Sequence, residues 1–222
     1  MVLWLERKNI LSNNTIVIID YNMGNLRSVQ KAFEQVGCEA IISNNHDLIK
    51  SADKIVLPGV GSFQDGIKNL NDLGLISLLN EEIIEKKKPF LGICLGMQLI
   101  ANKSYENGET KGLGWVDAEV IKFDFSSSKQ KLKVPHVGWN NVVYQNKNDL
   151  FNGIQNNNDF YFVHSYYFKT DENVISSITD YGLNFVSSIQ KNNIYAFQFH
   201  PEKSQTSGLK ILENFVNLKG VI

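Results

Sequence analysis

The sequence contains few cysteines, few prolines and no long apolar run. Its 222 residues include 2 cysteines, Cys38 and Cys94, and 4 prolines. Two cysteines are too few for a disulfide framework or a cysteine-based metal cluster, and they favour one reactive thiol in a reducing compartment. No apolar run approaches the roughly 20 residues that a membrane-spanning helix needs. We therefore expect a cytoplasmic protein with no metal site.

An excess of charge of either sign is also absent. The 22 Lys and Arg residues nearly balance the 23 Asp and Glu residues, which leaves a formal net charge of -1. Bulk charge therefore does not favour nucleic acid or an anionic membrane as a partner. Apolar residues make up 43% of the chain, enough to bury a full core. We interpret residues 1–14 as an N-terminal extension and residues 15–222 as one domain.

The first half of the chain alternates between short apolar strands and amphipathic helices. Apolar residues recur at helical spacing from Leu26 to Val36 and from Ile67 to Ile83, with a break expected near Gly74. This alternation predicts an α/β fold with a mostly parallel, doubly wound sheet flanked by helices. The predicted strands are residues 15–19, 40–42, 54–57 and 90–93.

The second half changes character, because short strand candidates there are separated by turn-rich segments rather than by helices. We expect these strands to add antiparallel pairing to the same mixed sheet. The predicted strands are residues 118–122, 141–144, 160–163, 174–175, 185–189 and 195–199, and residues 207–218 form a closing helix.

The segment 92–96, with the sequence GICLG, places Cys94 between a predicted strand and a predicted helix. A strand, a sharp turn and a helix with a nucleophile at the tip are typical of the nucleophile elbow of hydrolases. Glycines on both sides give the room that so tight a turn requires. The start of a helix also favours the thiolate form of a cysteine. Cys38 has no such surroundings, and we interpret it as a small buried apolar residue.

A His-x-Glu pair far downstream completes a candidate catalytic group. His200 can act as the base for Cys94, and Glu202 can turn back onto the other ring nitrogen and fix its tautomer. The sequence therefore predicts a Cys–His–Glu triad. His136 and His164 belong to no such pair, so we assign them to loop support or to an interface, and His46 to the surface.

The glycine-rich segment 58–62 follows a predicted strand but lacks the Lys-Ser/Thr ending of a phosphate-binding loop. We interpret it as a strand whose N–H groups receive an oxyanion, with Val60 and Leu95 as the backbone donors. The glycines Gly59 and Gly61 would let a peptide flip turn the Val60 N–H toward the site. A simple tight turn between strand and helix is the alternative interpretation.

Two segments of this sequence, 92–98 (GICLGMQ) and 197–204 (FQFHPEKS), resemble the class I, or triad, glutamine amidotransferases. Four more are similar to the glutaminase subunits of imidazole glycerol phosphate synthase, and the resemblance runs from about residue 16 to the C-terminus. One departure is Asn22, where the family often has glycine. The four segments are 19–29 (IDYNMGNLRSV), 57–63 (LPGVGSF), 133–140 (KVPHVGWN) and 161–166 (YFVHSY).

The resemblance implies that Cys94 attacks the side-chain amide of glutamine, that His200 shuttles the proton, and that a thioester is hydrolysed to glutamate. In this family the ammonia passes to a (β/α)8-barrel synthase subunit, with which the glutaminase forms a heterodimer. That subunit makes imidazole glycerol phosphate and an aminoimidazole carboxamide ribonucleotide in histidine biosynthesis. The resemblance implies no organic cofactor and no metal.

Further residues are assigned by matching the family's motifs. Gly59, Gly61 and Gln98 match positions that contact glutamine, although Gln98 could also be a surface amide of a helix. The positions that match the partner interface are Asn25, Trp139, Asn140 and His164. For Trp139, a place in the hydrophobic core is the alternative.

Three other functions are compatible with these motifs. A paralogous subunit could supply ammonia to a surface-sugar amidotransferase, with the same chemistry in another pathway. A non-catalytic regulatory subunit could keep the fold, although such a relative is expected to lose the cysteine, histidine or glutamate that are all present here. A cysteine peptidase or hydrolase is the third, and the interface-like segment 133–140 argues against it.

Overall fold

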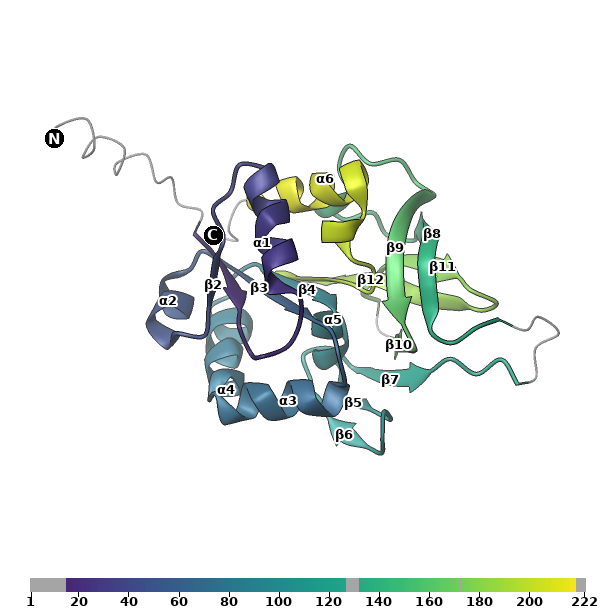
Figure 1. Cartoon of the computed structure of the whole chain (residues 1–222), viewed down its shortest axis with the longest axis horizontal. Helices are drawn as coiled ribbons and strands as arrows, with labels where there is room; N and C mark the ends of the chain where they lie inside the picture. The colour runs from purple at the N-terminus through teal and green to yellow at the C-terminus, as the bar shows by residue number, and fades with distance from the viewer. Residues whose placement is uncertain (1–14, 127–131, 172, 219–222) are drawn as a thin grey trace, which may run out of the picture.

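Five parallel strands form the centre of the molecule. The computed structural model describes residues 15–126, 132–171 and 173–218, so the predicted extension 1–14 lies outside the described residues. Neighbouring strands run parallel and lie in an order typical of doubly wound sheets, as Figure 1 shows. The order is β2 (Ile41–Ser43), β1 (Ile16–Ile19), β3 (Lys54–Gly59), β4 (Phe90–Cys94) and β13 (Ile194–Phe197).

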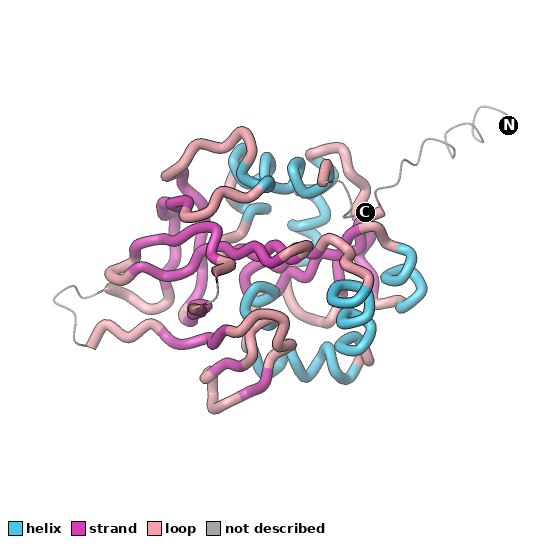
Figure 2. The backbone as a smooth tube through the Cα atoms, turned by 180° about the vertical axis from the view of Figure 1, so that it is seen from behind, coloured by secondary structure: helices cyan, strands magenta, loops and turns pink. Residues whose placement is uncertain are grey.

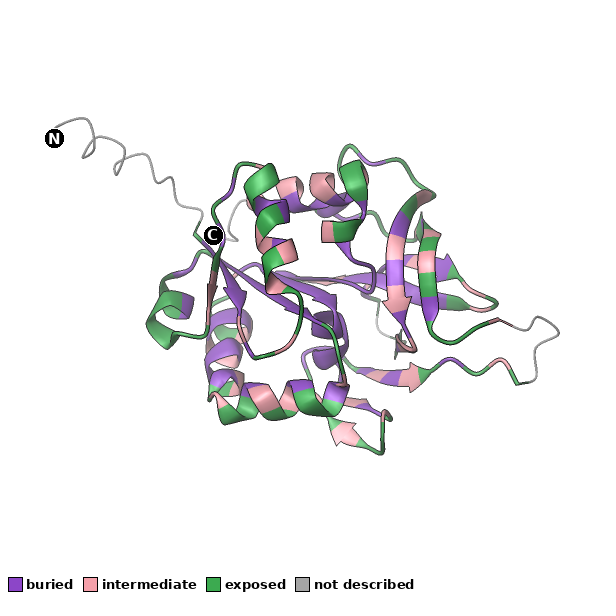
Figure 3. Cartoon of the chain, viewed as in Figure 1, coloured by how far each residue is buried: buried purple, intermediate pink, exposed green. Residues whose placement is uncertain are grey.

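Helices cover both faces of this parallel sheet. The helices α1 (Leu26–Gln35) and α6 (Gln205–Val216) pack on one face. On the other face lie α3 (Phe63–Asp72), α4 (Leu75–Leu79) and α5 (Leu95–Leu99). Side chains alternate along a strand, so successive residues of β1 contribute to the two opposite cores. The central strands are therefore buried on both faces, as the colouring of Figure 3 makes clear.

The strands beyond β13 extend the sheet mostly with antiparallel pairs. Beyond β13 come β12 (Asn184–Lys191), β10 (Tyr166–Thr170) and β7 (Ala118–Lys122), and then the short strands β5 (Lys103–Ser104) and β6 (Thr110–Lys111). Among them, β5 and β7 pair in parallel. A branch of β11 (Ile175–Asp180), β8 (His136–Tyr144) and β9 (Asn158–His164) joins through β12. Figure 2 shows these strands gathered on the side of the molecule away from its termini.

The predicted fold class is confirmed, and several boundaries differ. Gly74, at a φ of +65°, separates α3 from α4 at the expected break. The strand predicted from residue 141 begins at His136, because the glycine and the polar residues between hide the alternation of a strand. The strand predicted over 195–199 ends at Phe197, and the closing helix begins at Gln205. Helix α2 (His46–Ser51), the π-helix Asn80–Glu85 and strand β10 were not predicted.

No helix within the described residues is both long enough and apolar enough to span a membrane.

Candidate active site

Cys94 stands on a strained turn at the end of β4, as the elbow motif predicts. Its φ of 52° and ψ of −104° lie in a region that residues with side chains rarely adopt. The flanking glycines are needed for close approach. A Cβ atom on Gly92 would lie 2.9 Å from the carbonyl oxygen of Gly96, and one on Gly96 would lie 1.7 Å from the carbonyl oxygen of Leu57. Strand β4 and helix α5 can therefore meet at this angle only with glycines at both positions.

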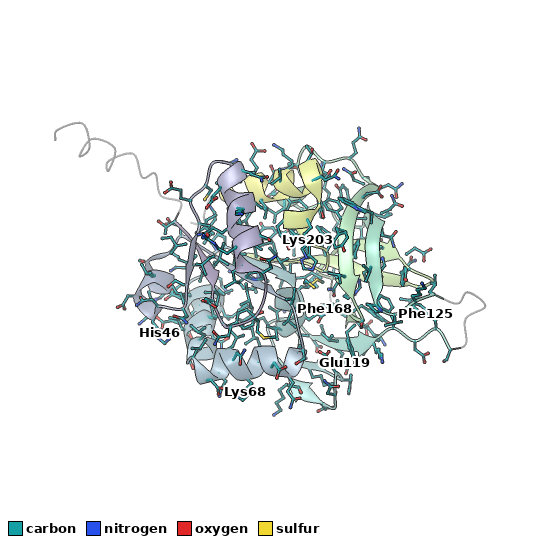
Figure 4. All side chains as sticks on the ribbon, viewed as in Figure 1. His46, Lys68, Glu119, Phe125, Phe168 and Lys203 are labelled. Carbon is teal, nitrogen blue, oxygen red and sulfur yellow. The ribbon has the colours of Figure 1, made fainter. Side chains whose placement is uncertain are left out.

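Neighbouring strands bring His200 to the same edge of the sheet as Cys94. Phe197, in the last register position of β13, lies opposite Ile93 of β4, so both chains leave the sheet side by side. The side chains of His200 and Glu202 are 2% and 3% exposed, and Nδ1 of the ring lies 2.7 Å from Oε1 of the carboxylate. In Figure 4 the next residue, Lys203, lies near the middle of the molecule, below α6. The three residues of the predicted triad thus lie at one site.

Electrostatics favour the protonated form of His200. Burial alone lowers the pKa of the ring, but the charge and hydrogen bonding of Cys94 and of Glu202 outweigh it and raise the pKa to about 10. The other ring nitrogen, Nε2, is buried and forms no hydrogen bond of good geometry within the described residues. The site therefore favours an imidazolium whose unpaired nitrogen can give a proton to a reacting group.

A cavity of about 290 Å³ opens beside the Cys94 sulfur. Val60, Gly61, Leu95 and Gln98, all assigned from the sequence, line this cavity. Gly59 lies behind it, next to His200 and Glu202. The other residues that line the cavity are Glu106, Pro135, Val163, His164, Ser165 and Tyr166.

The cavity and its surroundings include three functional candidates that were not predicted. Glu106 is the one acidic residue that lines the cavity, and its carboxylate accepts the N–H of Phe63 at 2.7 Å. Gln198 is fully buried, and its Nε2 lies 3.7 Å from the Cys94 sulfur. The hydroxyl of Tyr21 is buried without a hydrogen bond within the described residues, and it would lie 2.0 Å from a Cβ on Gly59. Gln198 adjoins the histidine motif and could have been found from it, whereas Glu106 carries no local motif.

The four residues matched to a partner interface lie in different surroundings. Trp139 is 46% exposed, and its ring packs against Tyr161 at 6.0 Å. Asn140 is partly buried and donates to the carbonyl of Asp180, and Asn25 caps helix α1. The side chain of His164 is buried at the cavity wall. Trp139 and Asn25 are therefore exposed, whereas Asn140 is partly buried and His164 is buried.

The remaining histidines are not members of the predicted triad, although His164 lines the same cavity as Cys94. Burial lowers the pKa of His136 to about 4 and that of His164 to about 3, and the two rings are hydrogen-bonded to each other. His46 is exposed on α2, far from Lys203 in Figure 4. In residues 15–126, 132–171 and 173–218, no three His, Cys, Asp or Glu side chains form a group that could hold a metal ion.

Comparison with known proteins agrees with this site. The sequence is 50% identical over 203 residues to imidazole glycerol phosphate synthase subunit HisH 1 of Campylobacter jejuni, covering 91% of this chain and 100% of that one. It is 52% identical over 201 residues to subunit HisH of that synthase from Aquifex aeolicus, covering 90% and 94%. The solved structure of PurLQS from Thermotoga maritima has a TM-score of 0.69 at 16% identity, over 93% of this chain and 99% of that one, a likeness that shows the fold alone. Since residues 17–218 match the family described as glutamine amidotransferase class-I, the chain belongs to that family.

Proposed function

We propose that this protein hydrolyses glutamine to glutamate and ammonia as the glutaminase subunit of an imidazole glycerol phosphate synthase in histidine biosynthesis. Half of its residues are identical to those of relatives that carry this subunit's name, over nearly their full length. The observation that supports the chemistry most directly is the strained Cys94 elbow beside the buried His200–Glu202 pair. A nucleophile, a base and a group that orients the base are together what acyl transfer from an amide requires.

In the proposed mechanism the thiol proton of Cys94 first passes to His200, which forms a thiolate beside the imidazolium, and the sulfur then attacks the side-chain amide carbon of glutamine. The N–H groups of Val60 and Leu95 stabilise the oxyanion that forms. As the intermediate collapses, His200 returns the proton to the leaving ammonia and a thioester remains. His200 then takes a proton from a water molecule, which attacks the thioester and releases glutamate. Glu202 holds the ring in position for both steps.

The cavity supports an amino acid as the substrate. Its acidic side chain, Glu106, can pair with the α-ammonium group of glutamine while the amide reaches toward Cys94. Gln98 uses its amide N–H groups internally, on the Tyr166 carbonyl and on Gln198, each at 3.0 Å. Its carbonyl oxygen is then the end that can accept a hydrogen bond from the substrate. Gly61 keeps the cavity wall free of a side chain.

The proposed partner is a (β/α)8-barrel synthase subunit that receives the ammonia. One exposed apolar side chain lines the cavity, and three more lie within four residues of Pro135, which also lines it. On a chain that acts alone these side chains would remain in contact with water. Trp139 belongs to this set, and an aromatic anchor of this kind is typical of interface hot spots. The apolar side chains are Val60, Val134, Val137 and Trp139, which are 36% exposed or more.

A substitution of Cys94 tests this proposal. Cys94→Ala should abolish glutamine-dependent product formation in the complex with the barrel subunit, because the nucleophile is lost. The same complex should still make product from free ammonia, because only the ammonia supply is affected. Unaltered glutaminase activity in Cys94→Ala, or in Cys94→Ser, would support a non-catalytic subunit instead.

The pathway is tested separately. Titrating the wild-type chain with the barrel subunit and its nucleotide ligand should raise a low basal glutaminase rate. High activity of the isolated chain with no response to the barrel would contradict the assignment. Activation by a sugar amidotransferase and not by the barrel would identify the paralogous role, and comparable turnover of peptide amides would identify a hydrolase.

A further inference from the structure

Both ends of the Gln198 side-chain amide are engaged inside the protein. Gln198 follows β13 directly and is fully buried. Its Oε1 lies 3.0 Å from Nε2 of Gln98, and its Nε2 lies 3.7 Å from the sulfur of Cys94. A buried amide with an unpaired end is costly, and here the oxygen and the nitrogen of Gln198 each have a partner.

A single backbone carbonyl determines which end of Gln198 faces the sulfur. The Tyr166 carbonyl can only accept, and the Gln98 atom 3.0 Å from it must therefore be the amide nitrogen. That same nitrogen lies 3.0 Å from Gln198, whose contacting atom must then be its oxygen. The remaining atom of Gln198, which faces Cys94, is the nitrogen. This orientation follows from the hydrogen-bond network and does not depend on how an isolated amide is assigned.

The Tyr166 carbonyl is itself held in place by His164. Nδ1 of this ring lies 2.8 Å from the carbonyl oxygen and must donate to it. Burial lowers the pKa of His164 to about 3, so the ring is neutral at physiological pH and its Nε2 is an acceptor. Nε2 lies 3.0 Å from Nδ1 of His136, which supplies the matching donor. Each hydrogen bond between the histidine pair and Cys94 therefore has a defined donor and a defined acceptor.

Besides His200, the sulfur of Cys94 has two polar neighbours with opposite preferences. The carbonyl of Val163, at 3.9 Å, can accept only from the neutral thiol. The N–H of Gln198 can donate to sulfur in either state, but such a bond is roughly twice as strong when the acceptor is charged. Of these two contacts, the one with Gln198 therefore favours the thiolate.

We propose that Gln198 is a further catalytic residue, whose amide N–H donates to the Cys94 sulfur and stabilises the thiolate that attacks glutamine. The inference rests on the proposed role of Cys94 as the nucleophile. In the activation step the S–H bond breaks and the proton moves to His200 Nε2, while the electron pair stays on sulfur beside the Gln198 N–H. When the C–S bond forms, this charge moves to the substrate oxygen and the oxyanion donors take over.

Alkylation of Cys94 by iodoacetamide as a function of pH tests this role without glutamine. We propose to make the substitutions in a Cys38→Ala background, so that Cys94 is the thiol that reacts. Gln198→Met keeps the length of the side chain and removes the donor, and Gln198→Glu replaces it with a negative charge. Gln190→Met is the matched control, because Gln190 is partly buried on β12 and donates to the Tyr195 hydroxyl at 3.2 Å.

The pH midpoint of alkylation should rise by about one unit in Gln198→Met, so that the reaction below the midpoint becomes about tenfold slower. Gln198→Glu should raise the midpoint further, and Gln190→Met should leave it unchanged. An unshifted midpoint in a folded Gln198 variant would overturn the inference. So would loss of the fold in both Gln198 variants with a folded control, because Gln198 would then be a structural residue. If the Gln198 variants shift the midpoint but the unsubstituted chain hydrolyses no glutamine even with the barrel subunit, the result would support this inference and contradict the proposed function.

Discussion

Nδ1 of His136 lies 3.0 Å from Nε2 of His164, and both rings are buried. Two buried imidazoles can share one hydrogen bond only if the acceptor nitrogen carries no proton. Their pKa values agree with this geometry, because burial lowers the pKa of His136 to about 4 and that of His164 to about 3. The pair is therefore a neutral support for the cavity wall, and protonation of either ring opposes the folded state.

The unfolding free energy should consequently fall in acid, and substitution of His164 should reduce this dependence. Between the ordinary pKa of 6.5 and the folded value of about 3, the unfolded chain binds a proton at His164 that the folded chain does not. Stability is then lost as the pH falls below 6.5. His164→Gln removes this proton, so the slope of unfolding free energy between about pH 6 and 4.5 should decrease by about 1.4 kcal/mol per pH unit. Urea unfolding of both proteins across this range measures it, and equal slopes would contradict the prediction.

Substitution Glu202→Gln should reduce glutaminase activity by about 100-fold or more, because the isosteric amide removes the charge and can hold His200 in the wrong tautomer. The pKa of His200, about 10 in the folded protein, should fall as well. Because His200 binds its proton more tightly in the folded chain, that proton stabilises the fold fully below pH 6.5, and the stabilisation is lost as the pH rises to about 10. At neutral pH most of it is present, so the variant should also be less stable there.

The measurements are glutamine turnover in the complex with the barrel subunit and thermal unfolding of the chain alone. Glu213→Gln is the control, since Glu213 pairs with Lys210 at 2.9 Å on the surface of α6 and is 46% exposed. Both proteins should fold, and the control should keep full activity. If Glu202→Gln keeps activity within about twofold of wild type, the carboxylate has no role in orienting the ring.

The sequence predicted the parts of the fold in which one physical signal dominates. The buried run of β1 and the elbow at Cys94 depend on local apolarity or on glycine sterics, so their elements were located correctly. Asn22, where the family often has glycine, adopts a φ of 61°, which asparagine tolerates better than most residues. Strand β10 was not predicted, because its polar and aromatic residues show no simple alternation. It forms by pairing with β7, which is more than 40 residues earlier in the chain.

The site residues also divide into those with a local signal in the sequence and those placed by contacts between distant segments. The residues proposed for the triad could be predicted because two motifs each carry a steric or chemical signature. Glu106 was missed, since it reaches the cavity only through the hairpin that joins β5 to β6. Gln198 was read as part of a strand, and its contact with Cys94 depends on the pairing of β13 with β4. Such contacts between distant segments arise only in the folded sheet, so no spacing of residues in the sequence indicates them.

Substitution Gly96→Ala should destabilise the fold strongly, because its Cβ would lie 1.7 Å from the Leu57 carbonyl oxygen in the backbone of β3. The backbone of a central strand cannot move aside, so we expect the unfolding free energy to fall by about 3 kcal/mol or more. Gly108→Ala is the control, since its Cβ meets nothing within 4 Å and only its φ of +107° opposes the substitution. That strain should amount to about 1 kcal/mol. Urea unfolding compares the two, and equal losses would contradict a close contact between α5 and β3.

Substitution Trp139→Ala should weaken binding of the barrel subunit at least about tenfold while leaving the chain itself nearly as stable as before. Trp139 is 46% exposed and packs against Tyr161 at one edge, so its removal exposes little core. The control is Leu48→Ala, because Leu48 is 41% exposed on α2, on the other side of the molecule from β8 in Figure 1. Titration calorimetry with the barrel subunit gives both affinities, and glutaminase activation in the same mixture reports coupling. Equal affinity and equal activation in the two variants would remove Trp139 from the interface.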